Sequence, residues 1–128
     1  MRIIRAAEVV GSPPPGPTFT GEVRISPILR DERIAANSVA FLAGARTYWH
    51  THEHGQLLLV TAGSAWVVGE DDVRHRVEQG DLVWSEPGER HWHGAVAATD
   101  MTHLAVSLGL TTWLGAAVDP TADTTARS

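Results

Sequence analysis

Residues that favour turns divide most of this chain into short segments, and this division constrains the fold more than any other sequence feature. Between residues 19 and 109, glycine, proline and aspartate recur at intervals of about 8 to 12 residues, a spacing expected for short strands. The segments between them are rich in valine, leucine and tryptophan. No amphipathic pattern with the helical period persists over this part of the chain. The sequence therefore predicts an all-β sandwich or barrel.

The apolar segments define the strands that we expect. They lie at residues 19–29, 38–42, 47–52, 56–61, 65–68, 73–77, 82–85, 91–96 and 102–108. Pro27 confines the first of them to a sheet edge or a bulge, because proline cannot donate to a central ladder. The run QLLLVT at 56–61 is continuously apolar, which predicts a strand buried on both faces. Polar residues predict a loop at 30–38, and Ala62-Gly63-Ser64 predicts a turn.

The chain is long enough for one domain with a substantial core, since it has 128 residues. Four prolines in GSPPPGP, residues 11–17, predict a flexible arm over residues 1–18. We expect the barrel at 19–115 and a frayed tail at 116–128, which is small and polar after Pro120. An edge strand that follows a flexible arm, with exposed aromatics expected among five tryptophans, favours a homodimer.

Charge and composition exclude several classes of function. The net charge is −5 and no basic cluster is present, which argues against nucleic acid or an anionic membrane as partner. No apolar run approaches the roughly 20 residues that span a bilayer, and the N-terminus lacks the apolar core of a signal peptide. We therefore expect a cytoplasmic protein that acts on a small molecule. The chain has no cysteine, so a metal ion would be held by His, Gln, Asp or Glu.

Histidines recur at alternate positions in two clusters. His50, His52 and His54 would project from one face of a strand, because successive side chains in a strand point to opposite faces. His91 and His93 repeat the pattern, and a sixth histidine, His103, lies on the last strand. Imidazoles on one face of a sheet suit a divalent metal such as Mn, Fe, Ni, Cu or Zn. The alternative interpretation is ordinary surface or core histidines, because His-x-His is a short motif.

The glycines around these histidines give a more specific pattern. The stretches GARTYWHTHEHGQLLLVTAG, residues 44–63, and GDLVWSEPGERH, residues 80–91, resemble the two signature motifs of the cupin superfamily. The resemblance implies a double-stranded β-helix, or jelly-roll barrel. It also implies one divalent metal ion, whose ligands would be His50, His52, Gln56 and His91. It gives His54 no ligand role.

Longer phrases resemble a narrower group. FTGEVRISP, GARTYWHTHEHGQLLLVTAGSAW, GDLVWSEPGERHWHGA and TDMTHLAVSLG are similar to small bacterial cupins that include the manganese-dependent (R)-selective hydroxynitrile lyases. The resemblance implies manganese as the working metal, with Fe, Ni or Zn as alternatives. It also implies a substrate pocket lined by His93, His103, Asn37, Val39 and Ser107.

The expected chemistry is cyanohydrin cleavage to an aldehyde and cyanide. His93 or His103, if not bound to metal, could act as the general base, because imidazole titrates in a useful range. The apolar Val39 and Phe41 would accept an aromatic group. Gln56 is uncharged, so the ligand set would leave the full charge of a divalent ion in place, which favours Lewis-acid chemistry.

Three other functions use the same ligands. An iron-loaded site could run a dioxygenase reaction, and a metal site could isomerise or decarboxylate a sugar or keto acid. Isomerisation or decarboxylation would need a cationic side chain that points into the barrel and binds the substrate carboxylate. Arg46 is the candidate near the barrel mouth. The third alternative is a non-catalytic ligand-binding barrel.

Overall fold

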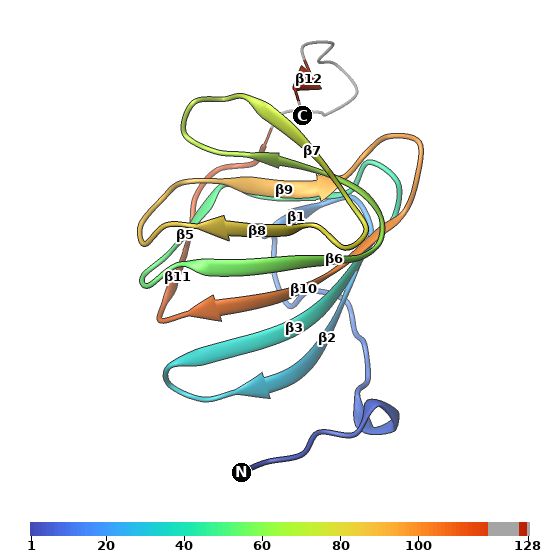
Figure 1. Ribbon diagram of the computed structural model, residues 1–128, viewed down its shortest axis with the longest axis vertical. Helices are drawn as coiled ribbons and strands as arrows, with labels where there is room; N and C mark the ends of the chain where they lie inside the picture. Colours follow the sequence, from blue (N-terminus) through green and yellow to red (C-terminus); the bar gives the residue numbers. More distant parts are fainter. Residues whose placement is uncertain (118–125, 128) are drawn as a thin grey trace.

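The structure, a computed structural model, describes residues 1–117 together with Ala126 and Arg127, and it confirms the all-β fold (Figure 1). A single 3₁₀ turn, η1 (Ala6–Glu8), lies in the N-terminal arm. The strands are β1 (Phe19–Thr20), β2 (Val23–Arg30), β3 (Ile34–Phe41), β4 (Arg46–Thr47), β5 (His50–His52), β6 (Gln56–Val68), β7 (Arg74–Glu78), β8 (Leu82–Ser85), β9 (Trp92–Ala95), β10 (Met101–Leu108), β11 (Thr111–Trp113) and β12 (Ala126–Arg127).

Strand β6 is the centre of the barrel, because it belongs to both of its sheets. Its first half pairs with β8 and β10, and its second half pairs with β7 and β9. The predicted turn at residues 62–64 is therefore wrong, since the strand runs on through Gly63. Gly63 has φ +77°, and a Cβ there would lie 2.0 Å from the Asp100 carbonyl oxygen. A glycine is thus required where the strand bends from one sheet into the other.

The prediction that residues 56–61 are buried on both faces is also wrong. Burial alternates along this segment, with Leu58 1% exposed and Leu57 38% exposed. Leu57 pairs across the ladder with Trp84 of β8, and both side chains lie on the outer face of the sheet. The inner face packs the core cluster formed by Val23, Val39, Phe41, Ala45, Val60, Ala65, Ala95 and Met101.

The hairpin of β2 and β3 is tighter than the sequence predicted. The Asp31 carboxylate accepts hydrogen bonds from the backbone N–H groups of Arg33 and Ile34, at 2.8 and 3.1 Å, and closes the turn. Strand β3 therefore begins at Ile34, and most of the predicted loop at 30–38 is strand. Both placements expected for Pro27 are confirmed, because β2 is the last strand of the sheet and its register shifts directly after Pro27.

The N-terminal arm covers one point of this sheet edge. Ser12 and Ile25 exchange two backbone hydrogen bonds, of 2.9 and 2.8 Å. The residues that precede Ser12 extend away from the barrel, at the end of the molecule opposite β7 (Figure 1). The apolar side chains of Ile3 and Val10 are 65% and 74% exposed. The homodimer and the flexibility of residues 1–18 remain predictions.

The predicted frayed tail, residues 116–128, lies mostly outside the described residues. Ala117 is buried, at 6% exposed, and β12 pairs in parallel with β7. Within the described residues, no helix has the length and apolar character needed to cross a membrane.

Candidate metal centre

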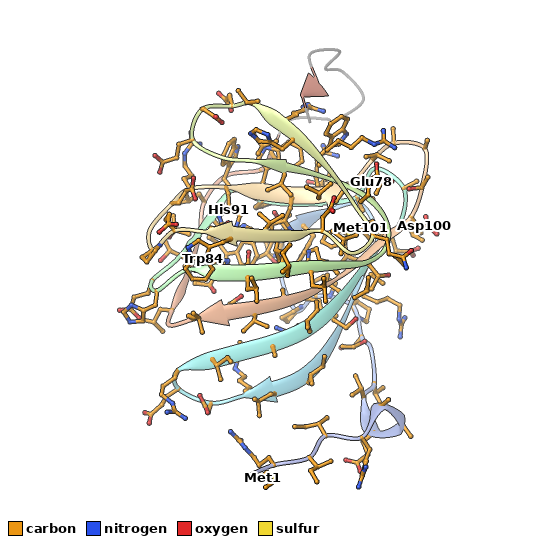
Figure 2. All side chains as sticks on the ribbon, in the orientation of Figure 1. Met1, Glu78, Trp84, His91, Asp100 and Met101 are labelled. Carbon is orange, nitrogen blue, oxygen red and sulfur yellow. The ribbon has the colours of Figure 1, made fainter. Side chains whose placement is uncertain are left out.

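A cavity of about 410 Å³ opens into the barrel. Nine of the ten residues that the sequence singled out line it, from strands β3, β5, β6, β9 and β10: Asn37, Val39, Phe41, His50, His52, Gln56, His93, His103 and Ser107. The tenth, His91, directly precedes β9 and is labelled in Figure 2. Its Nε2 lies 3.0 Å from the side-chain oxygen of Gln56, so it belongs to the same cluster.

Backbone pairing brings the two histidine clusters together. His50 lies at the start of β5, and its N–H donates to the His91 carbonyl at 2.9 Å, while the His91 N–H donates back at 3.0 Å. The two imidazole rings are 4.3 Å apart between centroids. In addition, the Nδ1 of His50 lies 2.7 Å from the Tyr48 carbonyl oxygen, and the Nδ1 of His91 lies 3.1 Å from that of Glu89. A carbonyl can only accept, so the Nδ1 of His50 carries the proton and its Nε2 keeps a lone pair for a metal ion. The two nitrogens of His91 both face acceptor oxygens, and a metal ion bound between its Nε2 and the Gln56 oxygen would leave the single ring proton on Nδ1.

His52 and Gln56 are oriented in a similar way. The Nδ1 of His52 lies 3.0 Å from the Thr111 hydroxyl, and its Nε2 is buried with no hydrogen-bond partner among the described residues. The Gln56 amide nitrogen donates to the Ser107 hydroxyl at 3.0 Å, which leaves its carbonyl oxygen directed at the histidines. A buried ring nitrogen without a partner is costly unless something binds it. The donor set therefore fits a divalent metal ion.

Burial keeps these imidazoles neutral. Burial, reinforced by the nearby His91, lowers the pKa of His50 well below its ordinary value. Burial also lowers the pKa of His52 to about 4, and it lowers that of His91. Neutral imidazole is the form that binds metal, so the site is ready for an ion at pH 7 without losing protons.

Two further histidines form a buried pair next to these rings. The Nε2 of His103 lies 2.9 Å from the Nδ1 of His93, and the residues are 1% and 3% exposed. The other nitrogens, Nε2 of His93 and Nδ1 of His103, have no hydrogen-bond partner in the part of the chain that the structure describes. Burial lowers the pKa of His103 to about 4 and that of His93 well below its ordinary value. Both are neutral bases at pH 7.

The tightest group of ring nitrogens is not the one that the sequence predicts. One nitrogen from each of His50, His91 and His93 lies within 4.8 Å of the others. His52 is next to them, with ring centroids 4.9 Å from His50 and 5.3 Å from His91. A group of three histidines that could hold one metal ion is therefore present, and either His52 or His93 could be its third ring.

Neither His54 nor Arg46 lines the cavity. The side chain of His54 is 68% exposed and lies 3.5 Å from the Glu53 carboxylate. The interpretation of Arg46 as the inward cation is wrong. Its guanidinium turns to the backbone, where it donates to the carbonyls of Ala117 and Gly44 at 3.4 and 3.2 Å. The cavity has Arg30 in its wall instead.

The sequence missed Arg30 and the contacts that β11 makes with the site. Strand β11 pairs with β5 and places Thr111 beside His52, and Trp113 lies 4.7 Å from the His50 ring. No local pattern links these residues, which are about sixty positions apart along the chain. The available signal for Arg30 was Pro27, because a bulge shifts every later side chain of the strand to the opposite face.

Comparison with known proteins gives the relatives of this chain. The family profile described as Cupin domain matches residues 37–107. A curated (R)-mandelonitrile lyase of Granulicella tundricola is 46% identical over 109 residues, which cover 83% of each chain. A solved cupin-like protein from Thermotoga maritima is 32% identical, with a TM-score of 0.80, over 84% of this chain and 87% of the other. The polyketide cyclase RemF from Streptomyces resistomycificus shares the fold at 17% identity, with a TM-score of 0.74, over 94% of this chain and 89% of the other.

Proposed function

This chain belongs to the cupin family, and on that premise we propose that it is a metal-dependent lyase that cleaves cyanohydrins. The observation that carries the proposal is the set of buried, neutral imidazoles held by their Nδ1 atoms around one point of the cavity. The identity with a relative named as a mandelonitrile lyase supports the same reaction.

We assign metal binding to His50, His52, Gln56 and His91. In each of the three histidines, Nδ1 lies within hydrogen-bonding distance of an oxygen atom. This is the arrangement that usually orients a metal-binding imidazole. The Nδ1 of His93 faces another imidazole instead. A bound divalent ion, for which we propose manganese, would act as a Lewis acid that lowers the pKa of a substrate hydroxyl.

The pair of His93 and His103 would then take the hydroxyl proton. Both rings line the cavity and each has one ring nitrogen with no partner among the described residues. Because they contact each other at 2.9 Å, a proton received by one can be shared with the second. As the hydroxyl loses its proton, the C–C bond to the nitrile breaks and its electron pair leaves with cyanide. The imidazole returns the proton, so the products are an aldehyde and hydrogen cyanide.

The apolar cavity wall beside His103 would hold the organic group. Val39 and Phe41 are 6% and 1% exposed, and the Phe41 ring lies 5.1 Å from the ring of His103. An aromatic substituent would therefore pack against Phe41, with the reacting carbon nearer the polar strand ends. Asn37 and Ser107 lie along the same wall as possible hydrogen-bonding groups.

The direct test is to incubate protein loaded with manganese with racemic mandelonitrile under anaerobic conditions. We expect benzaldehyde and cyanide in equal amounts, with the (R)-enantiomer consumed first. The same protein treated with a chelator is the control. Benzaldehyde at or below the control level would refute the proposal. Activity that needs iron and oxygen would point to a dioxygenase instead.

The charge of residue 56 gives a separate prediction. In Gln56→Glu, the carboxylate would cancel one unit of the charge of a bound divalent ion and weaken its effect on the substrate hydroxyl. We expect the rate of cyanohydrin cleavage to fall by about tenfold or more, while metal analysis still finds about one ion per chain. A Gln56→Glu variant as active as the parent would contradict the charge argument.

A further inference from the structure

The charge of the cavity differs from that of the whole chain. The chain has 15 acidic and 10 basic residues, and its net charge is −5. Among the described residues that line the cavity, however, none is Asp or Glu, and Arg30 is the one Arg or Lys. An acidic protein thus encloses a cavity without a negative side chain. Such a cavity favours a ligand that carries negative charge.

A β-bulge directs Arg30 into this cavity. Arg24 and Arg30 are six positions apart on β2, so in a regular strand both would point to the same face. Between Pro27 and Leu29 the register with β3 shifts by one residue, and Arg30 pairs with Ala35 while Arg24 pairs with Ala40. Ala35 lines the cavity, as Arg30 does. Bulges commonly re-aim a side chain in this way beside a functional site.

Cross-strand pairing connects Arg30 with the histidine cluster. Arg30 pairs with Ala35, Ala35 with Ser107, and Ser107 with Gln56, so the four residues form one row across β2, β3, β10 and β6. Adjacent strands are about 4.8 Å apart, so the row spans roughly 14 Å between the Cα atoms of Arg30 and Gln56. Alanine is the smallest side chain of the row and leaves space for an extended arginine. A small ligand can therefore contact both ends.

The guanidinium of Arg30 is available. Arg30 is an exposed residue in the lining of the cavity, and within the described residues it makes no hydrogen bond or ion pair. By contrast, Arg24 donates to the Gly11 carbonyl at 2.7 Å. A planar guanidinium with free donors is suited to bind a carboxylate through two parallel hydrogen bonds.

We propose that Arg30 forms a carboxylate-binding subsite at the cavity mouth. The cavity would then select ligands that place one end at the histidines and carry a carboxylate at the other end. The inference rests on the proposed function only in taking this cavity as the substrate site. It extends the substrate class from neutral cyanohydrins to carboxylic acids that also carry an apolar or aromatic part for the Phe41 wall.

The test compares a carboxylate with its neutral isostere. The dissociation constants of 3-phenylpropanoate and 3-phenylpropanamide are measured by calorimetry for the parent protein, Arg30→Gln and Arg24→Gln. Each is measured with manganese bound and after chelation, because a carboxylate could otherwise bind the ion directly. We expect the parent to bind the carboxylate about two- to fivefold more tightly than the amide, the range for an exposed ion pair.

In Arg30→Gln the preference for the carboxylate should disappear with and without metal, while amide binding is unchanged. Arg24→Gln should keep the preference, because its side chain is on the outer face of the same strand. A preference that survives in Arg30→Gln, or that is absent from the parent, would overturn the proposal. Since no turnover is measured, a failure here is distinct from a failure to cleave mandelonitrile.

Discussion

Replacing His52 by alanine is expected to weaken manganese binding by more than about a hundredfold, beyond the loss typical of an outer-shell change. Cyanohydrin cleavage should be lost with the metal. Replacing His93 by alanine should leave about one manganese ion per chain, while the rate of cleavage falls. The two variants decide which ring completes the group around His50 and His91.

The two rings compete because distance and orientation give different answers. By distance, His93 forms the tightest group with His50 and His91, within 4.8 Å. By orientation, His52 is the better ligand, because its Nδ1 faces the Thr111 hydroxyl oxygen, whereas the Nδ1 of His93 faces the ring of His103. We give orientation more weight, since a bound ion can draw ligands together by small rotations, and an oxygen partner on Nδ1 is the arrangement typical of a metal-binding imidazole.

Equilibrium dialysis against manganese, followed by metal analysis, measures both variants. His54→Ala is the matched control, because His54 lies two positions further along the chain but is largely exposed. It should bind metal as the parent does. If His93→Ala loses the ion and His52→Ala retains it, then His93 is the ligand and the proposed general base must be His103 alone.

The sequence was informative where a local pattern reflects a local cause. Turn residues at regular spacing predicted the strands, and the alternation of His50 and His52 correctly placed both in one cavity, because side chains two apart share a face of a strand. Pro27 predicted an edge or a bulge for the same local reason. The glycine spacing of two motifs added His91, which no periodicity argument could place beside His50.

The sequence failed where the cause is tertiary. The apolar run at 56–61 gave no sign that Leu57 would lie on an outer face, because leucine is compatible with either environment. Gly63 was interpreted as a turn, although its positive φ serves a bend within a long strand. Arg46 turns to backbone carbonyls, and a bulge in β2 places Arg30 at the cavity instead. Register of this kind depends on strand pairing, which the sequence alone does not give.

Acid is expected to destabilise the metal-free protein well before its carboxylates titrate. Burial lowers the pKa of His103 from 6.5 to about 4. Between these two values the unfolded chain binds a proton at His103 and the folded chain does not. The free energy of unfolding should therefore be highest above pH 6.5, fall as the pH decreases toward 4, and level off below it. A shift of this size corresponds to roughly 3 kcal/mol for this one residue.

Other groups in the cavity should act in the same direction. Burial lowers the pKa of His52 to about 4, and those of His50, His91 and His93 are also lowered. Because these rings contact one another, their contributions are coupled, and the total is less than the sum of separate effects.

Urea unfolding at pH 7 and at pH 4.5, in the presence of a chelator, measures the effect. We expect the urea midpoint to be markedly lower at pH 4.5. His103→Gln, which removes one titrating ring, should show a smaller difference between the two pH values than the parent, whatever its own stability at pH 7. His75→Gln, which removes an exposed histidine outside the cavity, is the matched control. Equal midpoints for the parent at the two pH values would mean that the buried histidines accept protons without cost. The cavity would then have to be open to water in solution.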